Sequence, residues 1–419
     1  MNRRNFRICW NFVFKNRNNF IIFLGSEPRK FQNLLQFFKL NYHLGNKNKM
    51  PIFGVIFYLF LLYLLYKIFT ISWILSIVLL VLFIVFLARM YFMNPQVEFI
   101  IKIIDFRFRI DNFFMGVYEN KGFCPLRFKL VQKFNQLISG GMPVPPDPVN
   151  THIESLKVKS LIDDHQVPMK IYIKEDILST ERKIPIVYYL YPGGFSVELP
   201  MPNKDEVLDL GVMLVTISYR LAPENKFPKA LEDSYSCLSY ITAKSNKILE
   251  KHWDGRLVVY GASAGGNIAT CSTLLVRDRG LGLDIICQLL ACPALFYTDK
   301  GLKSQILYKD WYFHGESSIK YINDMLMRDQ NDYENPYLCP LKAKSLKGLP
   351  DAYFLLGERD YFCSEGELYY EKLKESGNKA ICRIYPGEHG FDISPNEVGK
   401  KAKREMFEYL KKKIEGKDK

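Results

Sequence analysis

The sequence has few of the residues that bind metals or crosslink secreted domains. Its nine cysteines are scattered without a C-x-x-C pair, and only six histidines occur in 419 residues. No Asn-x-Ser/Thr sequon is present either. The chain therefore offers neither a metal-ligand spacing nor a disulfide framework, and buried thiols are the default expectation for cysteines in apolar elements. We expect no metal and no cofactor.

Acidic residues are nearly absent from the first 90 positions. Residues 1–50 carry ten Lys/Arg against Glu27 alone, a net charge of +9, and residues 51–90 add Lys67 and Arg89 without any acid. Of the formal net charge of +13, only +2 is left for residues 91–419. The basic character is thus confined to the N-terminal flank, which argues against a nucleic-acid partner and indicates a membrane topology signal.

Charged residues are also absent from residues 68–88, a run long enough for the ~20 residues that cross a bilayer. A shorter apolar run, 52–66, precedes it across Lys67, with no Gly or Pro at the junction to form a turn. One transmembrane helix within 51–90 is therefore favoured over two. Positive charge upstream places the N-terminus in the cytosol and the rest in the lumen, whereas two spans would put the catalytic domain on the cytosolic side.

Residues 1–50 show no clear periodicity and have no predictable fold. They are expected to be a disordered basic flank, or not to be translated if Met50 is the initiator.

After a Pro-rich linker at 142–148, apolar runs alternate with helical patterns. This alternation predicts an α/β domain over 91–419, with a mostly parallel sheet and helices on both of its faces. Two helical segments, about 97–150 and 296–348, are candidates for a lid. The predicted strands are 167–173, 184–190, 212–218, 256–260, 285–290, 352–356 and 380–385, and the predicted helices are 228–243, 267–276, 364–376 and 395–414.

A G-x-S-x-G motif at 261–265 lies between a predicted strand and a predicted helix. Small residues beside Ser263 suit a sharp, strained turn, which exposes the hydroxyl at the carboxyl end of the strand. The helix N-terminus beneath it offers backbone N–H groups to a developing oxyanion. Taken alone, the motif fits a plain strand–helix turn equally well.

Two further groups follow predicted strands. Asp360 comes after strand 352–356, and His389 lies in a glycine-flanked loop after strand 380–385. Parallel strands place these ends at one edge of the sheet. A serine hydroxyl needs a base to take its proton, and a histidine base needs a carboxylate to fix its tautomer. The three candidates follow one another along the chain as Ser, Asp and His, which is the order expected for α/β-hydrolases. Glu358 is a rival for the acid, and Asp360 has the alternative role of a helix N-cap.

A third loop, Tyr191-Pro192-Gly193-Gly194, follows strand 184–190. Two successive glycines allow backbone N–H groups to approach a substrate oxygen, although a bare turn is the alternative.

Several motifs resemble the hormone-sensitive-lipase-like branch of the α/β-hydrolases, and most closely its membrane-anchored arylacetamide deacetylase and neutral cholesterol ester hydrolase group. They are YPGGF at 191–195, SYRLAPE at 218–224, GASAGG at 261–266, Leu349-Pro350 and HGF at 389–391. The resemblance implies an α/β-hydrolase fold in which Ser263 is the nucleophile, His389 the base and Asp360 its partner. The oxyanion donors would be the N–H groups of Gly193, Gly194 and Ala264, and the membrane would be that of the endoplasmic reticulum.

The chain departs from this family at two places. Tyr191 and Pro192 replace the His and first Gly of an H-G-G-G motif, and Ala262 stands where relatives usually have Asp. The missing histidine normally braces the loop, so the oxyanion hole is expected to be weaker or reshaped. The expected function is a membrane-anchored serine hydrolase that cleaves carboxylic esters, or arylamides, of apolar acyl groups. The alternative is a catalytically weak or inactive ligand-binding protein on the same fold.

Overall fold

A computed structural model describes residues 146–296, 301–309, 315–394 and 396–417. The expected basic flank, membrane anchor and most of the first lid segment lie outside these residues. Within them, no helix has both the length and the apolar character required to span a membrane.

The described chain alternates strands with helices from residue 151 onward. The strands are β1 (Thr151–Lys159), β2 (Gln166–Lys174), β3 (Ile184–Leu190), β4 (Met213–Ile217), β5 (Trp253–Ala262), β6 (Asp284–Ala291), β7 (Asp351–Gly357) and β8 (Ala380–Tyr385). The α-helices are α8 (Glu175–Leu178), α9 (Lys204–Leu208), α10 (Lys229–Thr242), α11 (Lys247–His252), α12 (Ala264–Asp278), α13 (Lys303–Leu307), α14 (Glu316–Leu326), α15 (Cys363–Glu375) and α16 (Glu397–Ile414). Three short 3-10 turns are η1 (Gln330–Glu334), η2 (Pro340–Lys342) and η3 (Phe391–Ile393).

All eight described strands form one sheet in the order β1-β2-β4-β3-β5-β6-β7-β8. β1 pairs antiparallel with β2, and β2 antiparallel with β4, whereas every other neighbouring pair is parallel. The prediction of a mostly parallel sheet is therefore confirmed. β1 was not predicted, because its residues are mostly polar and only Val158 is buried.

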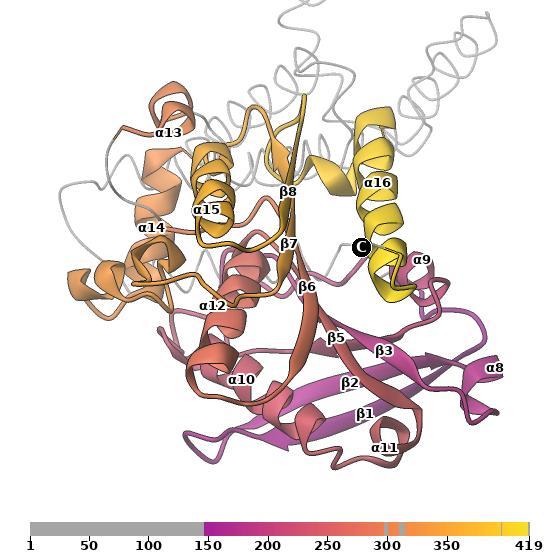
Figure 1. Cartoon of the computed structure of the whole chain (residues 1–419). Helices are drawn as coiled ribbons and strands as arrows, with labels where there is room; N and C mark the ends of the chain where they lie inside the picture. Colours follow the sequence, from indigo (N-terminus) through magenta and orange to yellow (C-terminus); the bar gives the residue numbers. More distant parts are fainter. Residues whose placement is uncertain (1–145, 297–300, 310–314, 395, 418–419) are drawn as a thin grey trace, which may run out of the picture. The chain divides into compact units, whose positions relative to one another are not determined.

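Helices cover both faces of the sheet, as predicted (Figure 1). α10, α12 and α15 lie on one side, with α12 packed on β3, β5 and β6, while α9 and α16 lie on the other. The strands predicted between 167 and 385 and the helices predicted between 228 and 414 are present, with ends that differ by a few residues. Between β6 and β7, the described parts of the second lid segment are helical, in α13, α14, η1 and η2.

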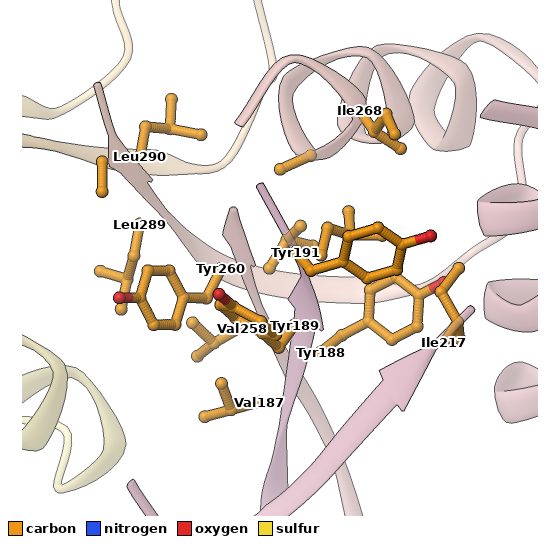
Figure 2. Packing of buried hydrophobic residues seen from close by; sticks show 14 of the residues in the cluster. Val187, Tyr188, Tyr189, Tyr191, Ile217, Val258, Tyr260, Ile268, Leu289 and Leu290 are labelled. Carbon is orange, nitrogen blue, oxygen red and sulfur yellow. The ribbon is translucent and has the colours of Figure 1, made fainter. Parts of the chain in front are cut away.

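The centre of the sheet is continuously apolar, because parallel strands are buried on both faces. Every residue of β3 is buried. Tyr189 of β3 meets Tyr260 of β5 edge to face, with ring centroids 5.0 Å apart (Figure 2). The hydroxyl of Tyr188, on the opposite face of β3, donates to the carbonyl of Ser234 in α10 at 3.2 Å. This core fixes the carboxyl ends of β3, β5, β7 and β8, from which the candidate site is built.

Candidate active site

Ser263 is the single residue between β5 and α12, and its backbone is strained, with φ 52° and ψ −117°. Its N–H donates to the carbonyl of Ala291 at 2.9 Å, and its own carbonyl accepts from Ala294 at 3.1 Å. A side chain on Gly265 would place its Cβ 2.0 Å from the carbonyl oxygen of Leu190. The small residues around the serine are therefore required by close backbone packing.

The structure brings Ser263, His389 and Asp360 into one hydrogen-bonded chain. The Oγ of Ser263 lies 2.8 Å from Nε2 of His389, although the two residues are 126 positions apart. Nδ1 of the same imidazole lies 2.8 Å from Oδ2 of Asp360. An ionised carboxylate only accepts hydrogen bonds, so Nδ1 carries the proton and Nε2 presents its lone pair to the serine hydroxyl.

The surroundings of Asp360 decide between the alternatives for the acid. Its side chain is 1 % exposed, and Oδ1 accepts a hydrogen bond from the N–H of Phe362 at 3.0 Å. The N-cap of α15 is Phe362, so Asp360 is not the helix cap. Glu358, the rival carboxylate, is exposed. The Phe362 ring stands edge-on to the imidazole of His389 at 5.2 Å and limits its movement.

The loop after β3 has an unusual backbone, with positive φ at Gly193 (134°), Gly194 (59°) and Phe195 (59°). A Cβ on Gly193 would lie 1.9 Å from the carbonyl oxygen of Val197, so no other residue fits there. Within the described part of the chain, the N–H groups of Gly193, Gly194 and Ala264 donate to no other residue. They are thus available as donors to a bound oxygen.

Tyr191 holds this loop through a reciprocal contact with Tyr219. The hydroxyl of Tyr191 donates to the carbonyl of Tyr219 at 2.9 Å, and the hydroxyl of Tyr219 donates to the carbonyl of Tyr191 at 2.8 Å. The two buried rings stack with centroids 4.0 Å apart. Sequence reasoning noticed that Tyr191 replaces a bracing histidine, but it did not identify Tyr219 as the partner.

A small apolar cavity adjoins the serine. Its volume is about 10 Å³, which is room for roughly one water-sized group. Among the described residues, its lining is formed by Gly194, Phe195, Ser263, Ala264, Ala294, Phe296, Ile322 and Phe362.

Two further buried groups adjoin the hydrogen-bonded chain, and sequence reasoning missed both. Burial raises the pKa of Asp392, which interacts electrostatically with His389. Burial also raises the pKa of Cys292, and the charges of Asp360 and Asp392 add to this effect. Cys292 lies far along the chain from Asp360 and Asp392, and Asp392, three positions after His389, was not singled out as part of the HGF motif.

Comparisons with known proteins match the same region. A sequence profile of the alpha/beta hydrolase fold matches residues 187–393. The chain is 30% identical over 272 residues to an arylesterase of Saccharolobus solfataricus, covering 63% of this chain and 84% of that protein. It is also 30% identical over 282 residues to a 2-hydroxyisoflavanone dehydratase of Glycyrrhiza echinata, covering 61% of this chain and 84% of that protein. A solved arylesterase structure superposes with a TM-score of 0.57 and 26% identity, covering 73% of this chain and 98% of that chain.

Proposed function

Because this chain belongs to the α/β-hydrolase fold family and is a carboxylic ester hydrolase, we propose that Ser263 is its nucleophile, His389 the base and Asp360 the partner of that base. The observation that carries the proposal is the unbroken hydrogen-bonded chain from the serine Oγ through both imidazole nitrogens to the carboxylate. The same chain speaks against a protein that only binds ligands, which would need no base beside the hydroxyl.

The reaction begins when Nε2 of His389 takes the proton of Ser263 as Oγ bonds to the carbonyl carbon of the ester. The negative charge that develops on the carbonyl oxygen is stabilised by the N–H groups of Gly193, Gly194 and Ala264. The imidazolium then protonates the departing alkoxide, and the alcohol leaves. A water molecule then attacks the carbonyl carbon of the acyl-enzyme and gives up its proton to His389. The acid and the free serine are released.

The substrates are esters of apolar acyl groups, with arylamides as a second class. The cavity beside Ser263 is lined by apolar side chains such as Ile322 and Phe296, and it is small. We therefore propose that short acyl groups, of acetyl size, are preferred over long chains.

The test is hydrolysis of p-nitrophenyl esters from acetate to octanoate by the purified full chain. The expected result is turnover that is fastest with the short esters and that falls by at least ~10³-fold in Ser263→Ala. An equal rate in that variant would overturn the assignment of the nucleophile.

We also propose that the enzyme is anchored in the membrane of the endoplasmic reticulum by a single helix within residues 51–90, with a cytosolic N-terminus and a lumenal catalytic domain. The support is the uncharged run at 68–88 and the excess of Lys/Arg before it. Protease treatment of sealed microsomes is expected to leave residues after 90 intact. Digestion of the catalytic domain from outside would contradict the lumenal orientation.

A further inference from the structure

Cys292 lies directly after β6, against the base His389 and its partner Asp360. It is 1 % exposed and has a left-handed backbone, φ 44°, which is uncommon for a residue other than glycine. Its N–H donates to the carbonyl of Leu355 in β7 at 2.8 Å, which fixes the residue between the two strands. In this position its sulfur, a carboxylate oxygen of Asp360 and a ring nitrogen of His389 all lie within 4.8 Å of one another.

A thiolate, an imidazole and a carboxylate are ligands that Zn²⁺ binds in proteins. Bond lengths of about 2.0–2.3 Å in a tetrahedral site separate the ligand atoms by roughly 3.3–3.7 Å. Nδ1 of His389 and Oδ2 of Asp360, now 2.8 Å apart, would have to separate by about 0.5 Å, and the sulfur of Cys292 would have to approach them by about 1 Å. Side-chain rotation supplies both changes. Within the described residues, no other group of three such donors is found.

The charge around the site favours a cation. Asp360 and Asp392 are both buried, and both interact electrostatically with Cys292. Lys403 is a cationic group that acts on Asp392, and its amine is paired with Glu206 at 3.0 Å. A divalent ion bound here would stabilise the ionised form of both carboxyl groups.

We propose that Cys292, Asp360 and His389 form an inhibitory site for a thiophilic divalent cation such as Zn²⁺ or Cd²⁺. The cation bonds to the sulfur, to Nδ1 and to a carboxylate oxygen, and water fills the fourth position. The thiol proton is released to solvent. The imidazole proton leaves Nδ1 and the ring is reprotonated at Nε2, so one proton is released in total.

This change of tautomer is what stops catalysis. With the metal on Nδ1, Nε2 carries a hydrogen atom and donates to the Oγ of Ser263, so it no longer accepts the serine proton. Metal binding and ester cleavage therefore exclude each other. Because Cys292 and Asp360 are almost completely buried, a cation reaches them only when surrounding side chains move, and inhibition should develop slowly.

The experiment compares the full-length wild type with Cys292→Ser, Cys292→Ala and the control Cys339→Ser. Cys339 is also buried, but it belongs to no cluster of ligands among the described residues. Each protein is incubated with ZnCl₂, and its ester hydrolysis is expressed relative to its own metal-free rate. We expect wild type and Cys339→Ser to be inhibited and restored by EDTA, and both Cys292 variants to need at least about 10-fold more zinc.

A second readout requires no substrate and so remains informative if ester hydrolysis is not the activity. Cd²⁺ bound to a thiolate gives an ultraviolet charge-transfer band, which is expected in wild type and in Cys339→Ser. In both Cys292 variants the intensity of this band is expected to fall by the contribution of one thiolate. Equal zinc sensitivity in all four proteins, or a cadmium band unchanged by both Cys292 substitutions, would overturn the proposed site. Absence of hydrolysis together with a Cys292-dependent band would instead contradict only the proposed function.

Discussion

Tyr191 and Tyr219 are joined by two reciprocal hydrogen bonds, of 2.9 and 2.8 Å, in which each hydroxyl donates to the backbone carbonyl of the other residue. Their rings stack almost parallel, at 8°. Tyr191 directly precedes Pro192 and the two glycines of the candidate oxyanion loop. The loop that lacks the histidine of its relatives therefore has a brace made from different residues.

Tyr191→Phe removes one of these hydrogen bonds and keeps the stacked ring. A buried neutral hydrogen bond is worth about 0.5–1.5 kcal/mol, so kcat should fall roughly 2- to 10-fold with little change in KM. The control is Tyr369→Phe, because the hydroxyl of Tyr369 is buried without a hydrogen-bond partner in the described structure. Steady-state kinetics on a short ester measure the difference. Equal kcat values for the two variants would show that the brace does not act on the reaction.

Asp360→Asn should lower kcat by about 10⁴-fold, because an amide donor at this position favours the wrong imidazole tautomer. Glu358→Gln changes an exposed carboxylate two residues away and should retain the wild-type rate. Ester kinetics on both variants provide the measurement. A larger loss of kcat in Glu358→Gln than in Asp360→Asn would show that Glu358, and not Asp360, is the acid.

Ile322→Ala enlarges the cavity beside Ser263. We expect the kcat/KM ratio of propionate to acetate esters to rise about 10-fold, since one methylene in an apolar pocket is worth ~1–3 kcal/mol. Ile306→Ala, at an exposed position of α13, is the matched control and should leave the ratio unchanged. A ratio that is the same in both variants would mean that this cavity does not receive the acyl chain.

Asp163 links the acid stability of the domain to two cations. It accepts hydrogen bonds from Lys229 at 2.6 Å and Arg220 at 2.7 Å, which hold the pKa of its carboxyl well below the usual range. A carboxyl group whose pKa is lower in the folded than in the unfolded state stabilises the fold at pH values above its unfolded pKa of about 4. This stabilisation is lost as the pH falls toward the folded-state pKa. Asp163→Asn should therefore lower the free energy of unfolding at pH 7, with a gap to wild type that narrows below pH ~4.

Urea unfolding at pH 7 and pH 3 measures this gap. The control is Asp164→Asn, whose carboxylate is 96% exposed and pairs only with Lys159 among the described residues. A gap of the same size at both pH values would contradict the role given to Asp163.

The parts of this protein that the sequence predicted are those with a local signal. β3 is a continuous apolar run because it is buried on both faces, and Ser263 is surrounded by the glycines that its turn requires. Asp360 and His389 could be placed near Ser263 because the carboxyl ends of parallel strands share one edge.

The parts that escaped prediction depend on contacts without a local signal. Nothing in the residues around Tyr219 indicates that its hydroxyl reaches a carbonyl 28 positions earlier. Cys292 faces Asp360 only because its backbone turns left-handed after β6, and its neighbours in sequence do not show this. β1 is mostly polar and is a strand because it pairs with β2.

The central claim is that the hydroxyl of Ser263 is made nucleophilic by His389. It is tested most directly by treating the full chain with a fluorophosphonate and locating the adduct by peptide mass spectrometry. The account predicts one adduct, on the peptide that contains Ser263, and its loss in both Ser263→Ala and His389→Ala. Labelling of wild type and Ser263→Ala to the same extent, or at another residue, would contradict it.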